Sequence, residues 1–322
     1  MTKLIYCSFI LLLAGCSSSS NYIPETQALN RSNLSSPDTT LTIANISSCT
    51  DSNDKSVQID ADSPITLLVH GCDGSAGRFR SLAELYAFHG QQAICYSYDD
   101  RESLVDNAEK LATAISQISQ ATNNQKTSII GHSMGGLIAR KALEKDSINS
   151  KKFDDNNLEL ITVSAPFSGI DIASQCGIKP LHWLSLGIVP GICWMITGDN
   201  WYEITAYSNF IKYPEPLVSS VDKFVKIVTN EENSFRKKDS NGKCIESDYV
   251  FSIDEQHNKI INGYDKTTTI QVDAGHVEIV GNKDIVPRKL IAVLQQHGML
   301  SYTPDNRQAD FERLLASLYL TP

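Results

Sequence analysis

The sequence predicts an α/β fold with a mostly parallel central sheet, helices on both faces and an inserted cap. Three observations predict it: short apolar runs typical of buried strands, helical spacing of apolar residues between these runs, and an interruption of the alternation at about residues 168–215. Strands that alternate with helices form parallel sheets covered on both faces. The chain has 322 residues, 41% of them hydrophobic, which is enough for a large buried core.

The first half of the expected domain alternates clearly. Two short strands with a turn-prone Asp-Ser-Asn-Asp between them are followed by an apolar run that ends at Gly71 and is typical of a buried parallel strand. Helices with apolar residues on one face alternate with the strands that follow. The expected strands are residues 41–46, 55–59, 65–70, 93–98 and 127–130, and the expected helices are residues 78–88, 103–120 and 136–144.

The second half begins with another expected strand at residues 158–163, after which the alternation is interrupted. It resumes with strands at residues 224–228 and 267–272, and residues 283–296 have helical spacing. No internal repeat is present in the sequence, and one domain over residues 41–322 accounts for the pattern. We therefore interpret residues 168–215 as a cap inserted into a single α/β domain.

The charge balance limits the partners of the chain. Its 37 acidic and 28 basic residues give a formal net charge of −9, and no run of Lys and Arg offsets it. Nucleic-acid binders need a concentrated basic face, so we expect no nucleic-acid partner. An acidic body is not attracted to anionic lipid either, so attachment to a membrane must depend on another feature.

The N-terminus supplies such a feature. Lys3 precedes a short apolar stretch, and Leu13-Ala14-Gly15-Cys16 resembles a bacterial lipobox, in which the cysteine receives the lipid. We expect residues 1–15 to be a lipoprotein signal peptide, residues 16–40 a flexible tether, and Cys16 the lipidated residue. Ser17 after the cysteine favours the outer membrane, with the face left open. An ordinary secretory signal or a buried helix is the alternative.

Six cysteines remain in the expected mature domain beyond Cys16. An even number in an exported chain favours disulfides, and their spacing fits no common zinc site. Six cysteines allow 15 pairings, among which the sequence does not choose, although Cys176 and Cys193 are close enough to close a local loop. The six are Cys49, Cys72, Cys95, Cys176, Cys193 and Cys244.

A Gly-x-Ser-x-Gly motif carries the predicted chemistry. Residues 131–136 read Gly-His-Ser-Met-Gly-Gly, directly after an expected strand and directly before an expected helix. A nucleophile on a sharp strand-to-helix turn requires small neighbours two residues away on each side. We therefore predict Ser133 as the nucleophile rather than a surface serine in a Gly-rich turn.

A serine hydroxyl requires a base, and three histidines follow it in the chain. In hydrolases with such a turn, an acid and then a histidine follow the serine. His276 comes after an expected strand and a short turn, which places it at the carboxyl edge of the sheet. His257 lies among charged residues and His297 at a helix end, so we favour His276 as the base.

Two carboxylates are candidates for the triad acid. Glu231 directly follows the expected strand at residues 224–228, whereas Asp248 is followed by an apolar pair about 28 residues before His276. We favour Asp248 over Glu231, because a buried triad acid needs apolar packing around it. A solvated surface carboxylate remains the ordinary alternative for either residue.

Two backbone N–H groups should form the oxyanion site. One belongs to Met134, the residue after the nucleophile, and the other lies on the loop after the strand at residues 65–70. Cys72 is the candidate for this second donor. A disulfide at Cys72 would stiffen the loop, and a purely structural cystine is the alternative reading.

These features together resemble the lipase-like branch of the α/β-hydrolase superfamily over residues 64–297. The elements at residues 64–71 and 131–136 are specific, and four further short segments are weaker matches. Those four are Ser164-Ala165-Pro166, Ser208-Asn209-Phe210-Ile211, Asp248-Tyr249-Val250 and Gly275-His276-Val277-Glu278-Ile279. Tyr249 stands where this acid segment often has Gly, and residues 230–247 are a polar insertion, so both depart from the family pattern.

The resemblance implies a serine esterase that works through an acyl-enzyme and a Ser-His-Asp triad, with no metal or organic cofactor. The cap is apolar, which suits a lipid-like or other hydrophobic acyl ester, although simple packing of cap against core explains it equally well. The residues expected to line the pocket are His70, His132, Trp183 and Trp194. A thioesterase, amidase or acyltransferase remains open, as does an inactive lipoprotein that binds a hydrophobic ligand.

Overall fold

A computed structural model describes most of the expected domain. The described residues are 28–145, 153, 156–170, 198–200, 202–238 and 244–319. The lipobox and most of the expected cap, with Trp183, Trp194 and Trp201, lie outside them. The division into signal peptide, tether and cap therefore stays a prediction. No helix within the described ranges has the length and apolar character needed to cross a membrane.

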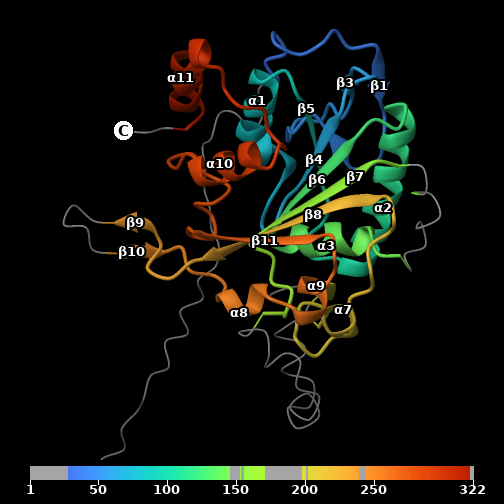
Figure 1. Cartoon of the computed structure of the whole chain (residues 1–322), viewed down its shortest axis with the longest axis vertical. Helices are drawn as coiled ribbons and strands as arrows, with labels where there is room; N and C mark the ends of the chain where they lie inside the picture. The colour runs from blue at the N-terminus through green and yellow to red at the C-terminus, as the bar shows by residue number, and fades with distance from the viewer. Residues whose placement is uncertain are drawn as a thin grey trace, which may run out of the picture.

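A seven-stranded sheet forms the centre of the described structure (Figure 1). Its strand order is β11-β8-β7-β6-β4-β5-β2, and all neighbouring strands pair in parallel except β2, which is antiparallel to β5. This confirms the predicted mostly parallel sheet. The strands are β2 (Ile46–Ser47), β4 (Ile65–Val69), β5 (Gln92–Tyr96), β6 (Thr127–His132), β7 (Leu158–Val163), β8 (Val221–Asn230) and β11 (Thr267–Asp273).

Helices cover both faces of this sheet. Leu67 and Leu68 are adjacent on β4 and point to opposite faces, yet neither is exposed to solvent. Leu67 belongs to a core with α2 (Leu104–Ala121) and α3 (Met134–Ala142). Leu68 belongs to a core with α1 (Arg80–Phe88), α10 (Arg288–Gln296) and α11 (Gln308–Leu318). Such double coverage explains why the strands are apolar without alternation.

Short elements connect these layers. Most of them lie at the ends of longer elements or in the connections on the side of the sheet where its strands end. They are η2 (Ala76–Phe79), η5 (Gly198–Asn200), α7 (Asn209–Lys212), α8 (Ile253–Gln256), α9 (Lys259–Asn262) and η6 (Asp305–Arg307). Of the expected cap, η5, α7 and part of the connecting chain are described.

The N-terminal strands differ from the expectation. The predicted strand at residues 41–46 is wrong as one element, because the chain bends between β1 (Thr39–Leu41) and β2. Asn45 adopts a positive φ of 65°, which interrupts an extended strand. β1 instead pairs with β3 (Val57–Ile59) in a separate two-stranded sheet, while β2 joins the edge of the main sheet.

Two more differences arise late in the chain. The expected helix at residues 283–296 begins only at Arg288, because the ring of Pro287 fixes the backbone at its N-terminal end. The polar insertion contains an unforeseen antiparallel hairpin of β9 (Phe235–Lys238) and β10 (Cys244–Ser247). This hairpin lies outside the main sheet, beside the ends of β8 and β11 (Figure 1).

A disulfide joins Cys49 and Cys95. It connects the segment after the short edge strand β2 to the C-terminal part of β5, so it ties the edge of the sheet together. Cys72 is exposed on the loop after β4 and is not in a disulfide with a described cysteine. The suggested pair Cys176 and Cys193 lies outside the described residues.

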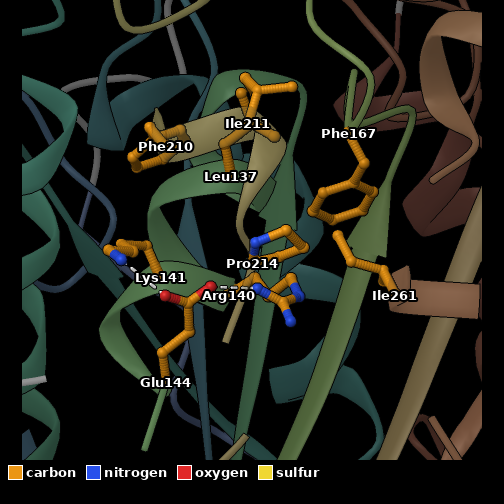
Figure 2. A pocket seen from close by; sticks show the side chains of 9 residues that line it. All are labelled: Leu137, Arg140, Lys141, Glu144, Phe167, Phe210, Ile211, Pro214 and Ile261. Carbon is orange, nitrogen blue, oxygen red and sulfur yellow. Dashed lines mark hydrogen bonds and ion pairs between the residues drawn. The ribbon is translucent and has the colours of Figure 1, made fainter. Parts of the chain in front are cut away.

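A buried ion-pair network stabilises the end of α3 and lines a small pocket (Figure 2). The Arg140 guanidinium contacts one carboxylate oxygen of Glu144, and Lys141 Nζ lies 2.6 Å from the other. Arg140 also donates a 2.7 Å hydrogen bond to the carbonyl of Glu215. Apolar side chains including Leu137 and Phe167 complete the lining. The network holds the chain after α7 against the helix that follows the nucleophile.

Candidate active site

Ser133 lies on a sharp turn between β6 and α3, as the motif predicts. Its backbone has φ 55° and ψ −126°, a conformation that residues with a side chain rarely adopt. The Ser133 N–H donates a 2.8 Å hydrogen bond to the carbonyl of Val163 on β7, which holds the turn in place. The surrounding hydrogen bonds and packing therefore maintain a strained backbone at this serine.

The glycines of the motif allow close backbone contacts around the turn. A Cβ at Gly135 would lie 2.2 Å from the carbonyl oxygen of His70, and one at Gly131 would lie 2.4 Å from that of Gly135. No side chain fits at either distance. The steric explanation of the motif therefore holds at both positions.

His276 follows β11 in the loop at the carboxyl edge of the sheet. Its Nδ1 lies 3.0 Å from Oε1 of Glu231, while the ring packs edge-on against Phe251 at 4.8 Å. The Nδ1–H donates to the carboxylate, which leaves Nε2 as the basic nitrogen. The imidazole thus has the tautomer that a general base requires.

The loop of His276 and the turn of Ser133 are in direct contact through His132. His132 Nε2–H donates a 3.0 Å hydrogen bond to the carbonyl of His276, and the two imidazole rings are 4.7 Å apart between centroids. Burial and then the nearby charge of His276 lower the pKa of His132 well below its ordinary value. A neutral His132 therefore holds the histidine loop against the residue next to the nucleophile.

Glu231 directly follows β8 and is buried, with 1% of its surface exposed. Its Oε1 accepts from His276, Ser164 (2.7 Å) and Thr229 (2.9 Å). Its Oε2 accepts from the N–H groups of Val250 at 2.6 Å and Phe251 at 2.8 Å. Burial alone would raise the pKa of Glu231, but the contact with His276 and the backbone N–H groups outweigh it, and the pKa is lowered.

Asp248 is placed differently from the expectation. Its carboxylate does not contact the His276 ring; it accepts backbone hydrogen bonds from Val277 (3.1 Å) and Glu278 (2.9 Å). The choice of Asp248 over Glu231 as the partner of the imidazole is therefore wrong in this structure. Apolar surroundings did not discriminate between them, because both residues are 1% exposed. The position relative to a strand end discriminates between them. Asn230 at the end of β8 pairs with Asp273 at the end of β11, so Glu231 leaves the sheet beside the loop of His276.

Ser164 and Thr229 belong to the site, although no sequence pattern indicates a role for either side chain. The Ser164 hydroxyl lies 2.9 Å from His276 Nδ1 and 2.7 Å from Thr229 Oγ1, in addition to its bond to Glu231. Ser164 has a positive φ of 50° directly after β7. The available sequence signal was its position directly after β7, which pairs with β6, the strand that leads to Ser133.

His70 and His132 were expected in the substrate pocket, and the structure gives both other contacts. His70 stacks on Tyr98 with 4.3 Å between centroids, and its Nδ1–H donates a 2.9 Å hydrogen bond to the carbonyl of Gly71. Burial lowers the pKa of His70. The ring is thus part of the support for the loop after β4. Trp183 and Trp194 lie outside the described residues, so the pocket itself stays a prediction.

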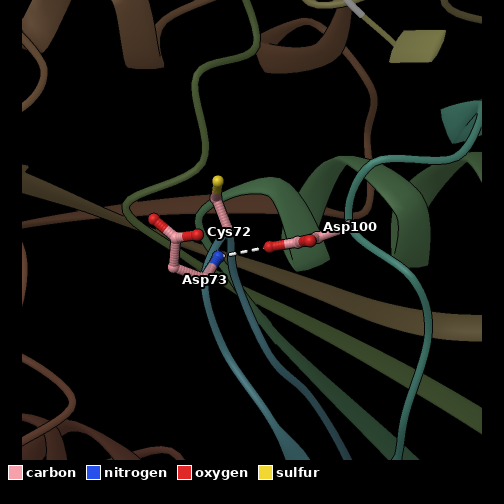
Figure 3. A group of neighbouring side chains, drawn as sticks. All are labelled: Cys72, Asp73 and Asp100. Atoms are coloured by element: carbon pink, nitrogen blue, oxygen red, sulfur yellow. Dashed lines mark hydrogen bonds between the residues drawn. The ribbon is translucent and has the colours of Figure 1, made fainter. Parts of the chain in front are cut away.

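The expected oxyanion donors lie on two segments that meet at Ser133. Met134 is the first residue of α3, so its N–H has no acceptor within the helix. A Cβ at Gly71 would lie 2.9 Å from that of Ser133, which places the loop with Cys72 directly beside the nucleophile. Figure 3 shows that the next residue, Asp73, donates its N–H to the Asp100 carboxylate. Asp100 therefore fixes the loop that carries the Cys72 amide.

Two groups of side chains in the described structure bring possible metal ligands within 4.8 Å of one another. Cys72 and Asp73 on the loop after β4 form one group with Asp100, which follows β5 (Figure 3), and Asp38, Asp60 and Asp62 form the other near β3. Neither contains Ser133, His276 or Glu231. The strand ends around Ser133 thus bring together a hydroxyl, an imidazole and a buried carboxylate, the groups that acyl transfer by a serine requires.

Comparisons with known proteins agree with this fold. Residues 62–193 match the family described as "Putative serine esterase (DUF676)". The chain is similar to the mature form of the Bacillus licheniformis lipase BlEst2, with 17% identity, a TM-score of 0.50, and coverage of 74% of this chain and 93% of that one. The propeptide form of the same lipase is also 17% identical, with a TM-score of 0.54, and the match covers 84% of this chain and 56% of that one. No curated protein matches the chain in sequence at a significant level.

Proposed function

We propose that the chain is a carboxylic ester hydrolase that cleaves esters through an acyl-enzyme with a Ser133–His276–Glu231 triad. Its match over residues 62–193 to the family described as "Putative serine esterase (DUF676)" and the fold that it shares with a lipase support the hydrolase assignment. The observation that carries the proposal is the contact of His276 Nδ1 with the buried Glu231 carboxylate at 3.0 Å, in a loop that His132 joins to the nucleophile turn. Glu231 replaces Asp248 in the triad expected from the sequence.

The reaction has two steps. The Ser133 hydroxyl attacks the ester carbonyl while His276 Nε2 takes its proton, and the amides of Met134 and Cys72 stabilise the oxyanion. His276 then returns the proton to the alcohol that leaves. A water molecule, deprotonated by the same nitrogen, attacks the acyl-enzyme and releases the acid. Glu231 stabilises the imidazolium in both steps, and its lowered pKa keeps it ionised at neutral pH.

A fluorophosphonate probe and Ser133→Ala test this proposal. The probe should label the wild type at Ser133, and Ser133→Ala should lose labelling together with esterase turnover, by about 10⁴-fold or more. Ser301→Ala is the matched control, because Ser301 is exposed and its hydrogen bonds are to Gln91 and Gln295 rather than to the proposed triad. A Ser133→Ala protein with more than a tenth of wild-type activity would exclude the nucleophile.

The substrate class is proposed to be hydrophobic acyl esters. The apolar residues of the expected cap support this choice, and Met134 and Phe251 supply buried apolar surface at the triad. Hydrolysis of p-nitrophenyl esters from acetate to decanoate measures it. Rates that rise with chain length are expected, whereas a steep fall beyond acetate would argue against lipid-like substrates.

We also propose that a lipid on Cys16 anchors the enzyme to the outer membrane. The lipobox-like Leu-Ala-Gly-Cys and the following Ser-rich segment support it. In a Gram-negative host, mass spectrometry of the mature protein should find an acylated N-terminal cysteine. Cys16→Ser should move the protein from the membrane fraction to the soluble fraction, and an unmodified wild-type N-terminus would contradict the anchor.

A further inference from the structure

Asp248 is a buried carboxylate that the proposed reaction does not use. It binds the loop of the base at three consecutive residues. Its backbone carbonyl accepts from the His276 N–H at 2.9 Å, and its carboxylate accepts from Val277 at 3.1 Å and Glu278 at 2.9 Å. Hydrogen bonds to an ionised acceptor are about twice as strong as neutral ones, so the carboxylate holds the backbone of this loop strongly.

The loop fits closely around this carboxylate. A Cβ at Gly275 would lie 2.1 Å from Asp248 Oδ2 and 2.5 Å from Cγ. Any larger residue at position 275 would displace either the carboxylate or the loop. The close approach therefore depends on a glycine directly before the base.

Arg236 supplies the positive charge that a buried carboxylate needs. It lies on β9, and its Nε donates a 2.7 Å hydrogen bond to Asp248 Oδ1. Its side chain is 28% exposed, whereas that of Asp248 is 1% exposed. The β9–β10 hairpin, the polar insertion that departs from the family pattern, thus contributes directly to the support of the histidine loop.

We propose that Asp248, held by Arg236, is a positioning residue for the base. The proposal rests on the proposed function, because it assigns His276 as that base. Glu231 fixes the ring at one nitrogen, which leaves the backbone of the loop free to shift. Asp248 fixes the N–H groups of residues 276–278, while His132 fixes the His276 carbonyl. Together they hold the loop of His276 against His132, the residue next to Ser133.

Asp248→Asn tests the proposal, because it keeps the shape and replaces one acceptor oxygen by a donor. A displacement of the base by about 1 Å can cost about 100-fold in rate, so we expect kcat to fall about 10- to 100-fold. KM should stay within about twofold, since substrate contacts are unchanged. The rate of fluorophosphonate labelling should fall in the same proportion, with an unchanged final labelled fraction.

Asp222→Asn is the matched control. Asp222 lies at the opposite end of β8, its side chain is 70% exposed, and its Lys266 partner is 4.0 Å away. Its substitution should leave kcat within about twofold of the wild type. A coupled pair is also informative: the losses from Glu231→Gln and Asp248→Asn should be less than multiplicative in the double variant, because both act on His276.

Turnover per labelled site that equals the wild-type value in Asp248→Asn would overturn the proposal. This holds even if a smaller fraction of the protein is labelled, because a smaller labelled fraction with normal turnover indicates only that less protein is folded. Where Asp248→Asn does not fold, Arg236→Gln decides: a fall in kcat of about 3- to 10-fold at constant KM supports the proposal, and wild-type kcat overturns it. An active Ser133→Ala would instead refute the proposed function. Inactive Ser133→Ala with normal Asp248→Asn refutes this inference alone.

Discussion

Two buried carboxylates around one histidine have different tasks at the residue scale. Glu231 contacts the imidazole, and Asp248 contacts the backbone that carries it. Each is saturated with donors, which is the condition for an ionised group to remain buried. Burial therefore does not distinguish the two carboxylates, whereas the position at a strand end does, because only Glu231 directly follows a strand of the main sheet.

Glu231→Gln should lower kcat by about 10³- to 10⁴-fold, because an amide at Nδ1 favours the wrong imidazole tautomer. KM should change little, since Glu231 does not contact substrate in the proposed reaction. Steady-state kinetics with a p-nitrophenyl ester measure the effect. Glu232→Gln is the neighbouring control, because Glu232 is exposed beside the same strand end. A loss of less than about tenfold in Glu231→Gln would reject Glu231 as the triad acid.

The hydroxyl of Ser164 should support the same contact. Its removal leaves Glu231 with one donor fewer, so we expect kcat to fall about 3- to 30-fold at constant KM, comparable to other losses of a single hydrogen bond to a charged group. Ser164→Ala and Ser164→Gly are compared, because both remove the hydroxyl but only Gly relieves the positive φ. Equal losses in the two variants indicate the hydroxyl. Wild-type kcat in Ser164→Gly would assign the effect to the backbone.

At the element scale, the parallel strands and long helices were predictable. The strand at residues 158–163 was predicted with the bounds that β7 has, because its apolar run is bordered by polar residues. Ser103 caps α2 through its side chain, as a start signal before a helical pattern indicates. The hairpin β9–β10 was not predictable, since its strands are polar and short and their pairing depends on contacts beyond the local sequence.

Lys226 on β8 is an element-scale exception, a charged residue within a buried strand. It is 1% exposed, its Nζ donates a 2.6 Å hydrogen bond to Asn262, and burial lowers its pKa to about 8. The unfolded chain therefore binds more protons than the folded one between about pH 8 and the ordinary lysine pKa of about 10.4. Over that range this group makes stability rise with pH.

Lys226→Met should consequently raise the Tm at pH 7, because it removes the burial of a charge while Asn262 is exposed and can bind water. The difference in Tm between the variant and the wild type should shrink as the pH rises from 8 to 10. Thermal unfolding at several pH values measures this difference, and Lys223→Met, at a half-buried lysine on the same strand, is the reference. A Tm difference independent of pH would refute the lowered pKa.

At the scale of the whole molecule, the sequence indicated that Ser133 and His276 lie at strand ends but did not indicate all of the residues around them. Ser133 and His276 each follow a parallel strand, and strand ends converge by topology alone. Glu231 reaches His276 because of the register of β8 against β11, and Ser164 reaches Glu231 because of its side-chain orientation. The periodicity of the sequence encodes neither feature. The pairing of cysteines likewise requires three-dimensional proximity.

The Cys49–Cys95 disulfide closes a loop with a sequence separation of 46 and secures a two-residue edge strand. Entropic restriction of the unfolded chain by such a loop is worth about 4 kcal/mol, so the Cys49→Ser/Cys95→Ser double variant should lose about 2–4 kcal/mol of unfolding free energy. Urea denaturation measures the loss. Turnover of the folded variant at 25 °C should stay within about twofold, because the bond lies in the sheet edge rather than at the triad.

Dithiothreitol extends this prediction to the remaining cysteines. If Cys49–Cys95 is the principal stabilising bond, the reductant should destabilise the wild type by the same amount as the double substitution and should leave the double variant unchanged. A further loss in the double variant would reveal a second disulfide among Cys72, Cys176, Cys193 and Cys244. Equal stability of oxidised wild type and double variant would mean that main-chain pairing of β2 with β5 suffices to hold this edge.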